Sequence, residues 1–350
     1  MIVIIIAGGS GTRLWPLSTP ERPKHLLNLT GDESLLQGTY RRAKELTDDI
    51  YVITEISHAH LVKEQVPELT DDKFIIEPGR RGTVNCLLAG LHYVQSRHDK
   101  DEPIAFIAAD HYIRDTRGFV ESFKIAGEAS KEHGKVVLVG IEPTYPNTGL
   151  GYIHKDGIIK DGGLVYEVVA FKEKPPFDTA KEYVHSGNYL WNCSYFVGSV
   201  NTFVETMEKF APTLKQDYEK LLATKGEADY KETYLAFETD TIDYALSEKV
   251  AERTFLVVPA SFDWMDVGNF KDAHDAVESD EQGNHLHGDA IGAIEVENSF
   301  VHNEEADKPI AVIGLDNVVV VNTPHGLLVA RKDLSQKVKE AVQQLQDKKV

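Results

Sequence analysis

Cysteine is nearly absent from this chain: its 350 residues include only Cys86 and Cys193. Neither cysteine has cysteine or histidine neighbours at metal-binding spacing, so the sequence indicates neither a disulfide framework nor a zinc knuckle. Long hydrophobic runs are missing too. The run from Ile2 to Ala7 has no basic residue before it and is too short for a signal peptide, and no later stretch approaches the length of a membrane span. We therefore expect a cytoplasmic protein without a membrane segment.

Positive charge is also scarce. Lysine and arginine total 37 against 56 aspartates and glutamates, which gives a formal net charge of -19. Such an acidic surface repels nucleic-acid phosphate and anionic lipid, so we expect neither a nucleic acid nor a membrane as partner. A small anionic ligand requires cations gathered locally. The N-terminal stretch "AGGSGTRLWPLSTPERPKHLLNL" gathers three of them, Arg13, Arg22 and Lys24, directly after a pair of glycines.

Short β-branched runs alternate with helix-like polar segments over the first half of the chain. This alternation predicts an α/β fold built on a Rossmann-like, doubly wound mixed sheet. Ligands of such sheets lie beyond the carboxyl ends of the strands, so the Gly9 loop and Asp110 are expected on one rim. The predicted strands are Ile2 to Ile6, Ile50 to Thr54, Lys73 to Ile76, Ile104 to Ala108 and Val136 to Gly140.

The second half of the chain changes character twice. Alternating, glycine-punctuated residues from Gly149 to Lys174 predict antiparallel strands, and helices are expected over about 202–222 and 241–249. A polar stretch near 278–289 predicts a boundary between residues 1–277 and a small C-terminal domain, 278–350. Short β runs there are spaced like the coils of a β-helix or a sandwich. An amphipathic helix from Leu334, with Asp333 and Gln336 as a capping box, is predicted to close the chain.

The glycine loop does not match the two common phosphate-binding fingerprints. Gly9 and Gly11 are followed by Leu14 where a dinucleotide fingerprint needs a third glycine, which disfavours a nicotinamide oxidoreductase. A Walker A loop would need a glycine-lysine-hydroxyl run, which is missing. The loop can still bring backbone N–H groups to a phosphate, with Arg13 and Lys24 as charged partners. Spacing alone leaves an ordinary tight turn as an equal alternative.

The same stretch resembles the signature of the sugar-1-phosphate nucleotidyltransferases, in particular their mannose-1-phosphate guanylyltransferase branch. Trp15 to Ser18 reproduce the tryptophan-proline-leucine-serine continuation of that branch. Later blocks follow in the order of the family: "IAADHYI", "TGLGYIH", "FKEKP", "SGNYLWN", "TIDYALSEK" and "DWMDVGNF". The resemblance covers residues 2 to 270, and a β-helix-like appendage of the family type is expected after them.

The resemblance implies an enzyme that transfers GMP from GTP to mannose 1-phosphate, with Mg²⁺ as cofactor. Two polyanions meet in this reaction, and each like-charge pair at about 4 Å costs roughly 4 kcal/mol at an effective dielectric of 20, so the site needs cations. By resemblance, Asp110 and Asp266 are the metal ligands, and Arg13 and Lys24 bind the reacting phosphates, which makes these four the catalytic residues. The nucleotide-binding residues would be Gly8, Gly9, Gly11, Thr12, Arg13, Arg81, Thr83 and Asp110. The sugar-phosphate-binding residues would be Gly149, Glu173, Lys174, Asn192 and Asp266.

Two blocks depart from the family pattern. "EPGRRGTVNC" stands where the family commonly has arginine-asparagine-threonine-alanine-proline, in a block that the resemblance places beside the nucleotide base, so another NTP is an alternative to GTP. Within the same chemistry, another hexose 1-phosphate is an alternative to mannose 1-phosphate. "WNCSYF" replaces the usual asparagine-serine-glycine-methionine-phenylalanine and loses its glycine. A non-catalytic nucleotide-sugar sensor is a further alternative, disfavoured because Arg13, Lys24, Asp110 and Asp266 are all present. We expect a homodimer, and no phosphomannose isomerase activity because the chain ends near residue 350.

Overall fold

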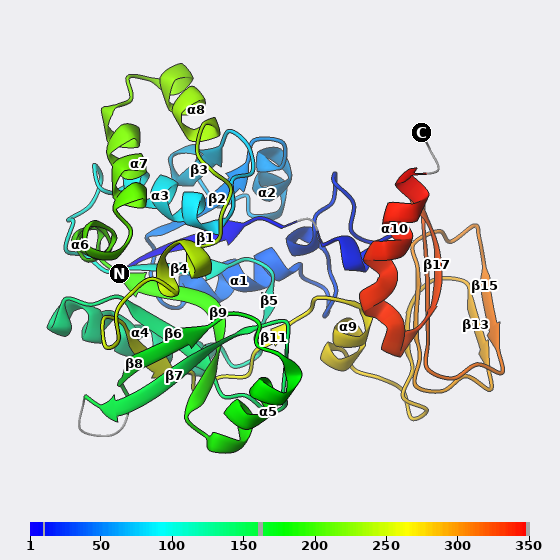
Figure 1. The fold of residues 1–350 in the computed structure, drawn as a ribbon. Coiled ribbons are helices and arrows are strands. Elements are labelled where there is room, and N and C mark those ends of the chain that lie inside the picture. Colours follow the sequence, from blue (N-terminus) through cyan, green and yellow to red (C-terminus); the bar gives the residue numbers. More distant parts are fainter. Residues whose placement is uncertain (10, 160–163, 348–350) are drawn as a thin grey trace. The chain divides into compact units, whose positions relative to one another are not determined.

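The computed structural model describes residues 1–9, 11–159 and 164–347 (Figure 1). Ser10 of the predicted glycine loop lies outside this range, as do the central residues of the predicted 149–174 strands and the end of the predicted C-terminal helix. The chain forms two compact units. The first unit comprises residues 1–7, 40–108 and 113–264, and the second comprises 8–39, 109–112 and 265–350. The predicted division at residue 277 stays a prediction.

A nine-stranded mixed sheet forms the centre of the first unit, in the order β3-β2-β1-β4-β9-β6-β10-β8-β7. Strands β1 to β4 are parallel, and β9 runs antiparallel to both β4 and β6. The expected doubly wound mixed sheet is therefore confirmed. The strands are β1 (Ile2–Ala7), β2 (Ile50–Glu55), β3 (Phe74–Glu77), β4 (Ile104–Ala108), β6 (Val137–Ile141), β7 (Gly151–Ile158), β8 (Tyr166–Lys172), β9 (Tyr189–Gly198) and β10 (Leu256–Pro259).

Helices accompany this sheet, and its core is built from the β-branched and aromatic residues of its strands. Ile4, Ile53, Phe106 and Phe196 are almost completely buried in one hydrophobic cluster, as continuous apolar strands of a covered sheet require. The helices are α2 (Ala59–Gln65), α3 (Thr83–Val94), α4 (Thr116–His133), α5 (Phe177–Ser186), α6 (Val200–Phe210), α7 (Pro212–Ala223), α8 (Glu227–Leu235) and the π-helix η4 (Asp243–Ser247); α1 (Leu35–Lys44) has residues in both units.

The second unit joins the N-terminal signature to the C-terminal strands. Parallel pairs β12–β14–β16 and β13–β15 stack as the coils of a short β-helix, which fits the expected appendage and excludes a sandwich of antiparallel sheets. Its elements are η1 (Thr12–Leu14), η2 (Lys24–Leu26), β5 (His111–Tyr112), β11 (Met265–Asp266), α9 (Phe270–Ala276), β12 (His285–Gly288), β13 (Ile291–Ile294), β14 (Phe300–Asn303), β15 (Ile310–Ile313), β16 (Val318–Thr323), β17 (Gly326–Arg331), η5 (Lys332–Lys337) and α10 (Val338–Asp347).

Three local predictions were wrong in detail. The helix expected over 202–222 is two helices, because Pro212 cannot continue α6 and instead begins α7. The expected helix over 241–249 is the π-helix η4. The capping box does not form: the Asp333 carboxylate accepts two hydrogen bonds from the Arg331 guanidinium, and α10 follows a 3-10 segment. A charge-assisted pair to arginine outcompetes a single backbone cap.

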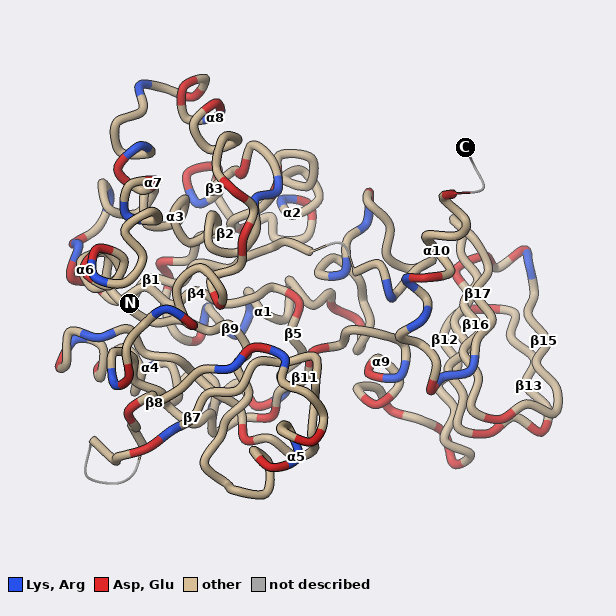
Figure 2. Tube along the Cα trace, in the orientation of Figure 1, with Lys and Arg blue, Asp and Glu red and all other residues tan. Residues whose placement is uncertain are grey.

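Charge is distributed along both units as the composition predicts, with acidic positions in the majority (Figure 2). No helix of the described residues is long and apolar enough to cross a membrane.

Candidate active site

Two carboxylates converge on one buried lysine in the second unit. The Lys24 ammonium lies 2.9 Å from Asp110 Oδ2 and donates a 2.6 Å hydrogen bond to Asp266 Oδ1. The Lys24 side chain is only 6% exposed, whereas that of Asp266 is 43% exposed. The structure therefore brings together three of the four predicted catalytic residues, although they are separated by up to 242 positions in the sequence.

A short antiparallel ladder places the two carboxylates side by side. In this ladder β5 pairs with β11, and Asp266 lies opposite His111, the residue after Asp110. Asp110 itself follows β4, as the sequence predicts, since β4 ends at Ala108. The sequence could not reveal the pairing, because two-residue strands leave no hydrophobic period to read.

Lys24 is fixed by the turns on either side of it. Pro23 is extended, with φ at -69°, and leads into η2, where Lys24 begins a 3-10 turn. Gly11 packs against this turn: a β-carbon at position 11 would lie 2.7 Å from both Lys24 Cβ and Ser18 Oγ. Gly11 also has a left-handed backbone with φ of +58°, which favours glycine. The predicted glycine loop is thus needed for close packing beside Lys24.

Electrostatics keeps this cluster charged at neutral pH. Burial opposes the charged form of Lys24, but the attraction of Asp110 and Asp266 outweighs it and raises the pKa of Lys24 above its usual value. Burial likewise opposes ionisation of Asp110, but Lys24 and, more weakly, His111 hold the Asp110 pKa well below its usual range. The stability that this ion pair contributes is therefore fully present between about pH 4 and pH 10, the unfolded pKa values of the two groups, and is lost progressively outside that range.

The cluster lines one side of a cavity of about 300 Å³. Arg13, the fourth predicted catalytic residue, also lines it, together with the predicted nucleotide-binding residues Gly11 and Thr12. The remaining lining residues are Gly268 and Lys339. Lys339 belongs to α10, far from every motif in the sequence, so sequence reasoning could not have found it. Gly8 and Gly9 come just before these lining residues in the sequence, and Gly9 has a left-handed φ of +98°.

The side chains of this cavity fit a divalent cation. The two carboxylates already share one cationic partner, which shows that their oxygens converge on a single point. The described residues contain no group of three or more His, Cys, Asp or Glu side chains placed to hold a metal ion. Magnesium is commonly held by one or two carboxylates, with water and substrate phosphate oxygens completing the octahedron, so two carboxylates are sufficient.

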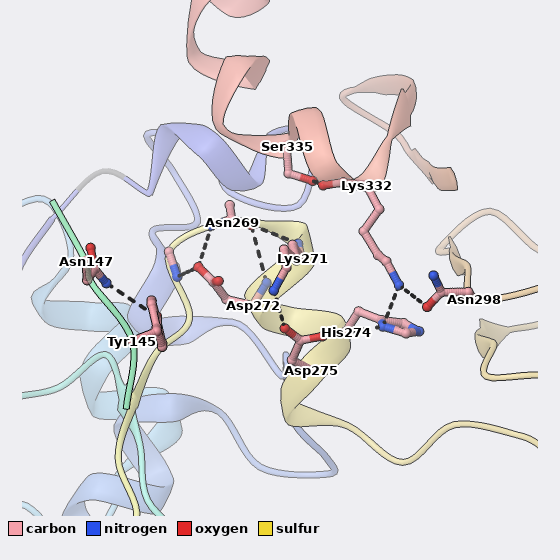
Figure 3. Close-up of polar contacts among 11 residues, drawn as sticks. Tyr145, Asn147, Asn269, Lys271, Asp272, His274, Asp275, Asn298, Lys332 and Ser335 are labelled. Atoms are coloured by element: carbon pink, nitrogen blue, oxygen red, sulfur yellow. Dashed lines mark hydrogen bonds and ion pairs between the residues drawn. The ribbon is translucent and has the colours of Figure 1, made fainter. Parts of the chain in front are cut away.

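The first residues of α9 hold the turn that follows Asp266. Asn269 caps this helix by accepting hydrogen bonds from the N–H groups of Lys271 and Asp272 (Figure 3). Asp272 in turn accepts hydrogen bonds from the Gly268 N–H and the Asn269 amide. Burial, followed by repulsion from Asp266, raises the pKa of Asp272 to about 6. The turn after Asp266 is therefore held by side-chain hydrogen bonds on both of its sides.

Most of the predicted sugar-phosphate residues lie in the first unit. β8 ends at Lys172, and Lys174 has a left-handed φ of +45°, so the chain turns sharply after the strand. This turn lets the Lys174 ammonium donate to Glu173 Oε1, and only 7% of the Glu173 side chain is exposed. Alternation along a regular strand would have separated these two side chains, and the turn after β8 brings them together.

Asn192 lies next to this pair and is held by two hydrogen bonds. Its amide donates to Asp243 Oδ1 at 2.7 Å, and its oxygen accepts from the Ser194 N–H at 3.1 Å. A β-carbon on Gly151 would lie 2.4 Å from Glu173 Oε2 and 3.3 Å from Asn192 Cβ. Strand β7, which begins at Gly151, therefore packs closely against both of these side chains. Gly151 and Asp243 were missed as neighbours of this group, although both lie in blocks that carry the family resemblance.

Gly149, the predicted sugar-site glycine, lies two residues before Gly151, and its N–H donates to Asn147 Oδ1 at 2.8 Å. Its assignment stays a prediction.

Ser194 stands where the family usually has glycine, and its backbone keeps a glycine-like conformation. Its φ is +56°, a region that costs a residue with a β-carbon roughly 1–2 kcal/mol. We expect Ser194→Gly to raise the free energy of unfolding by about 0.5–1 kcal/mol, measured by urea denaturation. Ser186→Gly, at the helical end of α5, is the control and should lower it by a similar amount. A destabilised Ser194→Gly variant would contradict the strain argument.

Asp243 gives the first unit a pH-dependent stability. Burial, followed by repulsion from Glu173, raises the Asp243 pKa from 3.8 to about 6, despite the hydrogen bond from Asn192. Between these values the folded state binds more protons than the unfolded state, so the contribution to stability falls as the pH rises from about 4 to 6. Asp243→Asn should remove this fall and add about 3 kcal/mol at pH 7, measured by urea denaturation across that range. Asp178→Asn, at an exposed position, should reproduce the wild-type pH profile.

Arg81 and Thr83, the predicted nucleotide-binding residues of the first unit, make hydrogen bonds within the protein. The Arg81 guanidinium donates twice to the Leu235 carbonyl at the end of α8, and Thr83 Oγ1 accepts from the Ile242 N–H. The second of these contacts leads directly to Asp243. Their role in nucleotide binding stays a prediction.

Comparison with known proteins gives these residues a family context. The nucleotidyl transferase family model matches residues 2–283, and the MannoseP isomerase/GMP-like beta-helix domain matches residues 289–345. The chain is 36% identical to the xanthan biosynthesis protein XanB of Xanthomonas campestris and to a mannose-1-phosphate guanylyltransferase of Salmonella muenchen. Both alignments cover 99% of this chain and 73% of the relative.

A solved structure extends the similarity to three dimensions. The protein described as a mannose-1-phosphate geranyltransferase from Thermus thermophilus matches with a TM-score of 0.86 and 30% identity, over 99% of both chains. Enzymes of this family generally use a divalent metal. The similarity over 99% of this chain and both matched domains show that the chain belongs to the mannose-1-phosphate guanylyltransferases of the nucleotidyl transferase family.

Proposed function

We propose that this enzyme transfers GMP from GTP to α-D-mannose 1-phosphate, giving GDP-mannose and pyrophosphate with Mg²⁺ as cofactor. The observation that carries the proposal is the pair Asp110 and Asp266 converging on Lys24, in a cavity that Arg13 also lines. A sensor that only binds nucleotide sugars has no need for two carboxylates with a shared cation. Relatives named mannose-1-phosphate guanylyltransferase support the choice of GTP and mannose.

In the proposed reaction, a phosphate oxygen of mannose 1-phosphate attacks the α-phosphorus of GTP. A new P–O bond forms as the bond to the bridging oxygen of the β-phosphate breaks, and pyrophosphate leaves with that electron pair. The attacking group is already anionic, so the step needs neither a covalent intermediate nor a general base. The protein has to supply mainly alignment and charge stabilisation.

Asp110 and Asp266 are proposed to hold the metal ion, which when bound neutralises charge on the phosphate oxygens. Lys24 then serves as a cation shared between carboxylates and phosphate, and its raised pKa keeps it protonated at any working pH. Arg13 is exposed on the cavity wall and is proposed to bind the β- and γ-phosphates with its fork of N–H donors.

Recognition of the sugar is assigned to the first unit. Glu173 is proposed to accept hydrogen bonds from mannose hydroxyls, and Lys174 to pair with the sugar phosphate. Asn192 is oriented for this role because both ends of its amide are already fixed by Asp243 and Ser194. Gly149 is proposed to line the same pocket, and Arg81 and Thr83 to lie near the base.

The test is a measurement of pyrophosphate release with each of the four NTPs, against mannose 1-phosphate and glucose 1-phosphate, with and without Mg²⁺. We expect activity with GTP and mannose 1-phosphate that requires the metal ion. Faster turnover with UTP would overturn the assignment of guanine, and faster turnover with glucose 1-phosphate that of mannose. An absence of reaction with every pair would favour the sensor.

A further inference from the structure

The lysine of the C-terminal helix is placed in the wall of the phosphate cavity. Lys339 lies in the first turn of α10 and lines the same cavity of about 300 Å³ as Arg13, Lys24, Asp110 and Asp266. None of the sequence blocks that carry the family resemblance includes it. Its side chain is exposed, so it can reach a ligand without breaking a buried contact.

The position of Lys339 is fixed by the packing of α10 against the hydrophobic cluster of the second unit. Val338, the neighbour of Lys339, is 3% exposed and belongs to the same hydrophobic cluster as Leu14, the neighbour of Arg13. Val342, one turn further along α10, packs against the same cluster. The helix is therefore anchored beside η1, which sets Lys339 and Arg13 on a shared wall of the cavity.

The charges of the cavity leave Lys339 available for an anion. The Lys24 ammonium is engaged by two carboxylates, whereas the side chains of Arg13 and Lys339 make no hydrogen bond or ion pair with another described residue. Three cationic and two acidic side chains line the cavity, so only one net positive charge faces it. A triphosphate carries about four negative charges, and the cavity without Lys339 would have no net positive charge to attract it.

We propose that Lys339 is a third phosphate-binding cation, which pairs with the β- and γ-phosphates of GTP beside Arg13. This proposal rests on the proposed function of the cavity. Because these two phosphates leave together as pyrophosphate, Lys339 should contribute to binding of GTP and of pyrophosphate. It should contribute little to binding of mannose 1-phosphate or GDP-mannose, because neither contains the two GTP phosphates that leave as pyrophosphate.

The test compares Lys339→Gln and Lys339→Arg with wild type in both directions of the reaction. Lys339→Gln should raise KM for GTP, and KM for pyrophosphate in the reverse reaction, by about tenfold, the value of one charge-assisted hydrogen bond. KM for mannose 1-phosphate and for GDP-mannose should change less than about twofold. Lys339→Arg should restore most of the lost affinity, because it keeps the charge.

Lys337→Gln is the matched control, because Lys337 is exposed at the end of η5 and does not line the cavity. Its constants should equal those of wild type. Unchanged constants for GTP and pyrophosphate in Lys339→Gln would overturn the proposal and make Lys339 an ordinary solvated lysine. An equal rise for all four ligands would also overturn it, since a structural disturbance would have that effect.

Calorimetric titration of inorganic pyrophosphate with Mg²⁺ into the same variants separates this proposal from the proposed function. A tenfold weaker Kd in Lys339→Gln than in wild type supports the phosphate contact, even if no NTP is turned over. An equal Kd overturns the contact, even if the enzyme makes GDP-mannose.

Discussion

Asp110→Asn should lower kcat for pyrophosphate release by about a thousandfold while leaving the protein folded. The substitution removes one of the two carboxylate charges proposed to hold the metal ion, and the loss of a group that stabilises transition-state charge costs about 10²–10³ or more in rate. Lys24 keeps its 2.6 Å hydrogen bond to Asp266, so the buried ammonium is not left alone. Steady-state assays over a range of Mg²⁺ concentrations, with urea denaturation alongside, measure both effects.

Asp289→Asn serves as the control for this variant, because Asp289 is an exposed carboxylate of the same unit. It should behave as wild type in both measurements. A folded Asp110→Asn enzyme with a rate within about threefold of wild type would remove Asp110 from the metal site.

Lys24→Met should both inactivate and destabilise the enzyme. Methionine fills similar space but leaves Asp110 and Asp266 facing each other without their shared cation. Breaking a fully buried pair costs about 3–5 kcal/mol, and we expect about 2 kcal/mol here, because Asp266 is 43% exposed and its charge is partly screened. Turnover should fall at least about a hundredfold, as expected for a cation that stabilises phosphoryl charge.

The pH dependence of this variant has a definite sign. In wild type, the depressed Asp110 pKa adds stability above its unfolded value of about 4, and that stability is lost at lower pH. In Lys24→Met, repulsion between the carboxylates favours protonation, so lowering the pH stabilises the variant. The difference in free energy of unfolding between the two proteins should therefore shrink from pH 7 to pH 4, measured by urea denaturation.

Added Mg²⁺ should stabilise Lys24→Met more than wild type, because the metal ion can take the place of the missing ammonium. Lys337→Met, at an exposed position, should show neither the pH effect nor this response. A constant stability difference from pH 7 to pH 4, together with no response to Mg²⁺, would rule out Lys24 as the cation that holds the two carboxylates.

The sequence by itself determined the sheet and the family. β-branched runs such as Ile2 to Ile6 can bury both faces, which requires a covered parallel sheet, and the order of short motifs indicates the nucleotidyl transferase family. The break between α6 and α7 could also have been predicted from the sequence, because Pro212 disfavours a continuous helix interior. The individual strands and the break at Pro212 are local features, so they depend only on neighbouring residues.

The family resemblance named Asp110, Asp266 and Lys24 as parts of one site, but only the tertiary structure decided how these charges meet and that Lys339 joins them. The β5–β11 ladder places Asp110 and Asp266 side by side, where both contact Lys24. The helix α10 buries Val338 in the same cluster as Leu14, which brings Lys339 to the same cavity. Such contacts join residues that are far apart in the sequence, and no periodicity in the sequence specifies their partners. The left-handed turns at Lys174 and Ser194, which are not glycines, were likewise hidden, because the surrounding packing imposes them against the local preference of the backbone.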